Sequence, residues 1–184
     1  MSQNVMSAVV LQTPIGIIHS THTSKGVQSI KLDQSYNENP TIINKNFGAS
    51  NVEVIDHSGP LDENVKSFID WLKAFFGDGQ MRSLPAIDNE IIDKQNFTGL
   101  VLRTLMMKTS CGSTLSYADL AKLCNSPKAC RAVGQAMRAN PIPLIVPCHR
   151  VVGSNGKLGH YMSGKGDNIK AWLLDHEKMA AGAL

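Results

Sequence analysis

The sequence of 184 residues lacks any long hydrophobic run and contains little charge. Its apolar stretches, such as residues 142–146, are far too short to cross a bilayer, so we expect no membrane association. Charged residues make up only 18%, whereas hydrophobic residues make up 42%, a balance that favours a folded core over disorder. The first six residues contain no basic stretch followed by an apolar segment, so we expect an intracellular protein.

Cysteine is also scarce. The four cysteines are Cys111, Cys124, Cys130 and Cys148. Without an export signal, they are expected to be free thiols rather than a disulfide framework. Cys124 and Cys130 have no second cysteine pair at ligand spacing, and both fall in expected helices, so we do not predict a metal site there.

Charge is unevenly distributed along the chain. Residues 1–100 hold 7 Lys and Arg against 11 Asp and Glu, whereas residues 101–184 hold 11 against 4. This change of sign suggests two functional parts, the second of which faces a polyanion, although two solvated faces of one domain would look the same. We predict an N-terminal domain over residues 1–92, with a linker from about residue 77, and a C-terminal domain over residues 93–184.

The N-terminal part favours an α+β unit. Alternating or β-branched residues predict strands at 8–11, 15–21 and 27–32, which would form a small three-stranded antiparallel sheet. A polar, Asn-rich stretch at 35–51 is expected to be mostly loop. One helix follows, because Val65, Phe68, Ile69, Leu72 and Phe76 share a face, and Gly77 is expected to end it.

The C-terminal part is mainly helical in its pattern. One helix is expected from Phe97 to near Cys111, and a second from Tyr117 to Cys124, capped by Ser116. Pro127 suits the first position of a third helix that runs to about Ala139. The last two helices make a helix-turn-helix candidate, although helix pairs with short turns are common in any helical domain.

The third helix is rich in small residues, which leave a low surface around Arg131. They are Ala129, Cys130, Ala132, Gly134 and Ala136. Such a helix can approach a narrow groove closely, but it can equally pack tightly against a neighbouring helix. A glycine inside a helix costs roughly 1 kcal/mol relative to alanine, which favours close approach as the reason for Gly134.

The segment from 141 to 153 carries the chemistry. An apolar stretch delivers Cys148 between Pro147, which restricts the backbone, and His149, which supplies a base. A cysteine reacts as its thiolate, so a neighbouring base increases its reactivity near neutral pH. Standing alone, however, a Cys-His dipeptide is more often structural than catalytic.

The sequence Pro-Cys-His-Arg-Val at 147–151 is similar to the active-site signature of the methylated-DNA–protein-cysteine S-methyltransferases, or 6-O-alkylguanine-DNA alkyltransferases. The similarity extends from about Phe97 to Glu177. Its further blocks are 116–117, 125–129, 131–134, 138–141 and 172–177, in the family's order and near its spacing. The resemblance implies an α+β fold with a winged-helix-like C-terminal domain.

The resemblance also implies a role for each matching residue. Cys148 would accept the alkyl group, His149 would act through a water as its base, Glu177 would orient that histidine, and Asn140 would brace the turn behind the site. Tyr117 would help to rotate the nucleotide and donate a hydrogen bond to the departing guanine.

The remaining residues would contact the substrate and the duplex. Arg131 would fill the gap left by the flipped base, with Ala129 and Cys130 against the minor groove. Further contacts to guanine or DNA are expected from Ser116, Arg138, Val151, Tyr161 and Ser163. The partner would be double-stranded DNA carrying alkylated guanine, bound by a monomer without a cofactor. The protein would act in the nucleus of a eukaryote or the cytoplasm of a prokaryote.

The chain departs from the family pattern in its pocket loop. It has Met162 before Ser163-Gly164, and about two extra residues before Trp172. The segment 159–166 resembles a phosphate-binding loop, but Gly166 replaces its final Ser or Thr, so we interpret it as a glycine-rich pocket loop.

A structural zinc ion, as some relatives hold in the N-terminal domain, is not expected. The corresponding positions are Thr23 and Gln28. His19, His22 and His57 are scattered, which is more typical of surface residues than of ligands.

Two other functions fit less well. A lesion-binding protein like the alkyltransferase-like proteins would flip the base without reacting, but such proteins typically lack the cysteine that this chain has at Cys148. A cysteine hydrolase that uses Cys148 and His149 would explain neither the helix-turn-helix nor Arg131.

Overall fold

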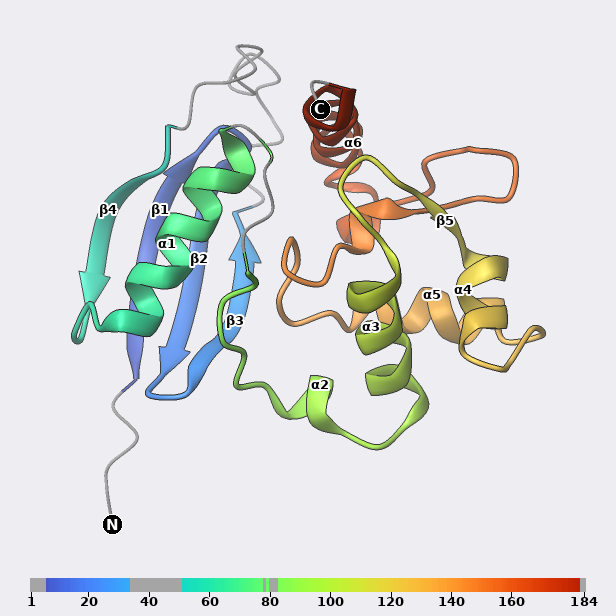
Figure 1. The fold of residues 1–184 in the computed structure, drawn as a ribbon, viewed down its shortest axis with the longest axis horizontal. Coiled ribbons are helices and arrows are strands. Elements are labelled where there is room, and N and C mark those ends of the chain that lie inside the picture. The colour runs from blue at the N-terminus through green and yellow to red at the C-terminus, as the bar shows by residue number, and fades with distance from the viewer. Residues whose placement is uncertain (1–5, 34–50, 78, 80–82, 183–184) are drawn as a thin grey trace. The chain divides into compact units, whose positions relative to one another are not determined.

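A computed structural model describes residues 6–33, 51–77, 79 and 83–182 (Figure 1). It divides into two compact units, one ending at Asn89 and the other beginning at Glu90. No helix in these described ranges is long and apolar enough to span a membrane.

The N-terminal unit is built on a four-stranded antiparallel sheet with the order β3-β2-β1-β4. The strands are β1 (Ser7–Thr13), β2 (Gly16–Thr23), β3 (Gly26–Leu32) and β4 (Glu53–Ser58). The first three were predicted, and their ends differ from the prediction by at most two residues. The fourth was not predicted, because every residue of this edge strand is exposed and its sequence has no alternation of apolar and polar residues.

Helix α1 (Glu63–Phe76) lies across one face of this sheet (Figure 1). Asp62 caps its start by accepting a hydrogen bond from the Val65 amide, and the helix ends at Gly77, as predicted. The five residues expected on its apolar face are all buried, together with Trp71 and Phe75. Burial of aromatic and aliphatic side chains on this scale provides the main stabilisation of the unit.

Two histidines of the N-terminal sheet are exposed, as expected, but His22 is not. His19 and His57 lie at the surface, whereas only 1% of His22 is exposed. The expectation for His22 was wrong, because its position in β2 directs the ring onto the core, where it packs 5.1 Å from the Phe68 ring. Its Nε2 is 3.0 Å from the Ser20 hydroxyl.

The last segment of the N-terminal unit adds to the edge of β3. Val27 donates a backbone hydrogen bond to Ala86 and accepts one from Asp88. Gly26 makes this approach possible, because a Cβ there would lie 2.3 Å from the Ala86 carbonyl oxygen. Thr23 donates a 2.5 Å hydrogen bond to the Asp88 carboxylate.

The C-terminal unit is mainly helical. Its helices are α2 (Glu90–Asp93), α3 (Phe97–Lys108), α4 (Tyr117–Leu123), α5 (Cys130–Arg138) and α6 (Asp167–Gly182). The helix predicted to run to near Cys111 ends at Lys108, because Thr109 is extended and a turn containing Gly112 follows. The cap predicted at Ser116 is confirmed. Its hydroxyl accepts a hydrogen bond from the Asp119 amide and donates one to the Asp119 carboxylate.

Helices α4 and α5 form the predicted helix-turn-helix pair, but α5 begins three residues later than expected. Asn125 adopts a left-handed conformation (φ 54°), and the Ser126 amide donates a hydrogen bond to the Ala121 carbonyl. These two features end α4 in a Schellman motif. Ala129 then donates to the Ser126 carbonyl. Pro127 therefore occupies the second position of a tight turn, which its fixed φ suits as well as it suits a helix start.

Short elements connect the helices to the apolar segment that carries Cys148. Strand β5 (Leu115–Ser116) pairs in parallel with β6 (Val151–Val152). Two 3-10 turns complete the unit, η3 (Cys148–Arg150) and η4 (Met162–Gly164). The β5–β6 pairing brings the start of α4 beside the segment that follows Cys148.

Candidate active site

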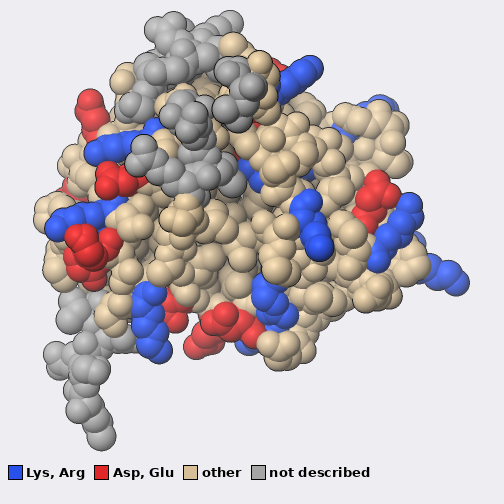
Figure 2. Space-filling model, in the orientation of Figure 1, with Lys and Arg blue, Asp and Glu red and all other residues tan. Residues whose placement is uncertain are grey.

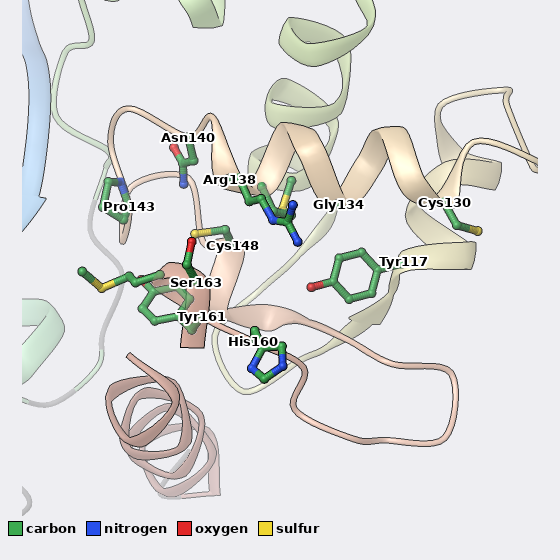
Figure 3. A pocket seen from close by; sticks show the side chains of 12 residues that line it. Tyr117, Cys130, Gly134, Arg138, Asn140, Pro143, Cys148, His160, Tyr161 and Ser163 are labelled. Atoms are coloured by element: carbon green, nitrogen blue, oxygen red, sulfur yellow. The ribbon is translucent and has the colours of Figure 1, made fainter. Parts of the chain in front are cut away.

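A pocket of about 340 Å³ lies in the C-terminal unit (Figure 3). The residues that line it are Tyr117, Cys130, Gly134, Met137, Arg138, Asn140, Pro143, Cys148, His160, Tyr161, Met162 and Ser163. They come from α4, α5, the apolar segment before η3 and the loop that contains η4. The pocket is large enough for a small ligand such as a nucleobase.

Cys148 lines this pocket, with 7% of the residue exposed. The segment before it is buried and folds on itself, with Leu144 left-handed (φ 77°) and the Val146 amide donating to the Ile142 carbonyl. Asn140 ties both ends of this turn: its Nδ2 donates to the Val146 carbonyl at 2.8 Å, and its Oδ1 accepts from the Ile142 amide at 3.1 Å. Asn140 therefore holds the turn that precedes Cys148 and also lines the pocket.

The Cys148 sulfur is a thiol rather than a thiolate in this environment. Burial raises its pKa, and polar contacts from Asn140 and Tyr161 and the charge of Lys170 offset that rise only in part. Desolvation penalises the charged form of any buried acid, so ionisation needs a base at the moment of reaction.

Behind Cys148, a fully buried network joins His149, Arg150 and Glu177. The His149 Nε2 lies 2.8 Å from Glu177 Oε1. Arg150 donates from Nε to Oε2 and from Nη2 to Oε1, both at 2.8 Å, which gives a bidentate pair. The Gly112 amide donates to Glu177 Oε2 at 3.3 Å. A side chain at Gly112 would lie 2.6 Å from the Ala181 Cβ, so this approach requires glycine.

The network fixes the protonation states of its members. Burial alone would raise the pKa of Glu177, but the hydrogen bonds from His149 and Arg150, together with the charge of Arg150, lower it. Burial lowers the pKa of His149, and Glu177 opposes this only in part, so the ring is neutral at pH 7. Because a carboxylate only accepts, the proton of the neutral ring is on Nε2, and Nδ1 is the nitrogen that can take up another proton.

Lys170 is a further buried cation of the site, and its charge acts on the thiol, with only 1% of the residue exposed. Its ammonium donates a 2.7 Å hydrogen bond to the Val151 carbonyl. Burial lowers its pKa, while Cys148 and Asp167 act in the opposite direction. A positive charge placed here stabilises negative charge that develops on the sulfur.

Tyr117 contributes a hydroxyl to the pocket. It begins α4 directly after β5, and its hydroxyl points toward the pocket in Figure 3. Burial and the neighbouring Cys148 raise its pKa, although Arg138 opposes the shift, so the group remains a hydrogen-bond donor.

Comparison with known proteins identifies this arrangement. The family described as "6-O-methylguanine DNA methyltransferase, DNA binding domain" matches residues 96–179. The methylated-DNA–protein-cysteine methyltransferase of Mus musculus is 37% identical over 182 residues, which cover 96% of this chain and 83% of that protein. The Homo sapiens protein of the same name is 35% identical, over 94% and 80% of the two chains. This chain belongs to the methylated-DNA–protein-cysteine methyltransferase family.

Solved structures agree with this assignment. The O6-methylguanine methyltransferase of Mycobacterium tuberculosis has a TM-score of 0.70 and 29% identity, covering 95% of this chain and 94% of that chain. A structure of the Mycobacterium tuberculosis protein in complex with DNA has the same TM-score at 28% identity, over 93% and 92% of the two chains.

The structure brings most of the predicted methyltransferase residues together, at different depths. Those that line the pocket are Tyr117, Cys130, Arg138, Asn140, Cys148, Tyr161 and Ser163. His149 and Glu177 are fully buried behind Cys148, and Val151 lies in β6 with its carbonyl bound to Lys170. Ser116 acts as the cap of α4, while Ala129 and Arg131 lie outside the pocket at the start of α5.

The exposed side of α5 is basic. Arg131 and Arg138 are both exposed, whereas Val133 and Ala136 face the core. No described Asp or Glu forms an ion pair with Arg131. A Cβ at Gly134 would make only an ordinary 4.0 Å contact with Tyr117, so internal packing does not require this glycine. Figure 2 shows Lys and Arg side chains spaced over the C-terminal unit, with Asp and Glu side chains beside some of them.

Sequence reasoning missed Arg150 and Lys170 as parts of the site. Lys170 had a detectable signal, because it precedes Glu177 by seven residues and so shares its side of α6 with buried residues such as Leu173. Arg150 had none beyond its place next to His149. Among the described residues, no three His, Cys, Asp or Glu side chains gather as a metal site would need.

Proposed function

We propose that this protein repairs DNA by transferring a methyl or larger alkyl group from the O6 atom of guanine to the Cys148 sulfur. The observation that carries the proposal is the Cys148 thiol, placed beside a pocket of nucleobase size with the His149–Glu177 pair behind it. The transfer needs no cofactor. A stable thioether results, so each molecule acts once.

The geometry supports a stepwise role for each side chain. The thiol proton passes through a water to His149 Nδ1, and Glu177 stabilises the imidazolium that forms. The sulfur attacks the alkyl carbon, so that an S–C bond forms as the C–O6 bond breaks. Tyr117 donates a hydrogen bond to the departing guanine, which finally takes up one proton to replace the one that left the thiol. Lys170 stabilises the sulfur while its charge is negative.

Access to the alkyl group requires a flipped base, because the group cannot reach a buried thiol from within a duplex. The exposed α5 surface supports docking in the minor groove, with Arg131 wedged into the stack in place of the extruded base. This activity would take place where the DNA is, in the nucleus of a eukaryote or the cytoplasm of a prokaryote. A protein that only binds the lesion is not favoured, since Cys148 is present at the pocket.

Intact-mass spectrometry after mixing with a methylated duplex tests the proposal. The wild-type protein should gain the mass of one methylene group, and peptide mapping should locate it on Cys148. Cys148→Ala should gain nothing while still binding alkylated duplex. Cys111→Ala removes a half-buried thiol outside the pocket and should transfer normally. A mass gain on Cys148→Ala, mapped to another cysteine, would contradict the assignment.

A further inference from the structure

One loop supplies four consecutive residues of the pocket, His160 to Ser163. Its backbone is unusual, because Met162 (φ 50°), Ser163 (φ 60°) and Gly164 (φ 93°) are left-handed in succession. Non-glycine residues rarely adopt this conformation, and two adjacent ones need support from their surroundings. Contacts from outside this run must therefore hold the loop in place.

Asp167, the first residue of α6, provides these contacts. Its Oδ1 accepts a 2.7 Å hydrogen bond from the Tyr161 amide, and its Oδ2 lies 3.1 Å from His160 Nδ1. The Tyr161 carbonyl in turn accepts from the amides of Gly164 and Gly166. The hydrogen bond from the Tyr161 amide, followed by the contact with His160, lowers the pKa of Asp167, which is therefore ionised at pH 7.

The two contacts of Asp167 differ in strength. His160 is 82% exposed, so its ion pair is screened by water and contributes little. The hydrogen bond from the Tyr161 amide is short and charge-assisted, and Tyr161 itself is buried. The main effect of Asp167 is therefore to fix the backbone at the point where the loop enters its left-handed run.

Gly166 allows the Met162 side chain to fold against this loop. A Cβ at Gly166 would lie 3.0 Å from the Met162 sulfur and 2.9 Å from the Tyr161 ring. Met162 therefore packs over Gly166 while it also lines the pocket. Thioethers are adaptable and make favourable contacts with aromatic rings.

We propose that Asp167 is a positioning residue that holds this loop in place. Met162 and Tyr161 then form a pocket wall that favours aromatic alkyl groups over methyl. The inference rests on the proposed alkyl transfer and extends it to a preference among substrates. A benzyl group offers far more apolar surface to a Met162–Tyr161 wall than a methyl group does, so the wall should favour benzyl transfer.

Single-turnover rates on duplexes that contain O6-methylguanine or O6-benzylguanine test this role of Asp167. Asp167→Ala should lower the benzyl-to-methyl rate ratio by roughly fivefold, the effect of losing one hydrogen bond. Asp167→Asn keeps an acceptor for the Tyr161 amide and should restore most of the ratio. Asp175→Ala removes an exposed carboxylate from the same helix and should leave both rates unchanged. Met162→Ala should lower the ratio as Asp167→Ala does.

Limited trypsin digestion gives a readout that does not depend on activity. Lys165 is exposed within the loop, so cleavage after it should be faster in Asp167→Ala than in the wild type, Asp175→Ala or Met162→Ala. If Asp167→Ala lowered the rates on both duplexes equally, or left cleavage after Lys165 unchanged, the proposed role of Asp167 would be wrong. If the wild-type protein transferred no alkyl group, the proposed function would fail, and the cleavage rates would still decide whether Asp167 holds the loop.

Discussion

Replacing Glu177 by Gln should weaken the C-terminal unit and slow alkyl transfer. The carboxylate is fully buried and accepts hydrogen bonds from His149, from two nitrogens of Arg150 and from the Gly112 amide. Removing one partner of a buried ion pair typically costs about 3–5 kcal/mol. We expect about 3 kcal/mol here, because the Gln oxygen can still accept from Arg150.

Hydrogen exchange of the α6 amides measures this loss within the unit. A loss of about 3 kcal/mol corresponds to exchange that is roughly a hundredfold faster. Transfer should slow by roughly a hundredfold or more, since a neutral amide cannot stabilise the imidazolium of His149.

A double variant separates stability from chemistry. Replacing both members of a buried ion pair by apolar residues is often neutral, so Arg150→Met with Glu177→Leu should recover part of the protection, although His149 and the Gly112 amide lose their acceptor. It should not recover transfer, because His149 still lacks its partner. If Glu177→Gln exchanged like the wild type, or if the double variant repaired DNA at the wild-type rate, the reasoning about this network would be wrong.

Three further predictions address other parts of the chain. Arg131→Ala should slow repair in duplex DNA far more than reaction with free O6-benzylguanine, because only the duplex has stacked bases that must be separated. Equal losses in the two rate constants would refute the wedge role. Dialysis against a chelator should leave transfer unchanged, and a loss of activity that zinc restores would contradict the expectation of no zinc. Burial lowers the pKa of His22 to about 4, although Asp62 opposes the shift. Because the unfolded chain then binds the proton more tightly, the N-terminal unit should lose stability as pH falls from about 6.5 to 4. His22→Leu should remove that slope when exchange of the β2 amides is followed with pH.

Local sequence signals predicted the elements whose residues contact the core in a regular pattern. The alternation in β3 and the apolar face of α1 were sufficient, as was the Ser116 cap. Strand β4 escaped prediction because it lies at the edge of the sheet and buries nothing, so only its hydrogen bonds to β1 define it. The start of α5 was wrong because Pro127 fits a turn and a helix start equally well.

The site could be anticipated only in part. The resemblance named Cys148 and Glu177, but their arrangement depends on contacts between residues far apart in the chain, such as the Arg150–Glu177 pair. Tyr117 reaches the pocket through the β5–β6 pairing, and strands of two residues carry no periodicity that a sequence pattern could reveal. The left-handed run that begins at Met162 could not be predicted either, because Met and Ser rarely adopt this conformation.

The raised pKa of Cys148 has a consequence for how long each molecule remains usable. Oxidants and small electrophiles attack thiolates far faster than thiols, and most readily where the sulfur is accessible. A thiol that stays protonated, in a residue of which only 7% is exposed, should react slowly with peroxide or with soluble alkylating agents. Because each molecule can react only once, this protection keeps the Cys148 thiol available for an alkylated guanine that binds in the pocket.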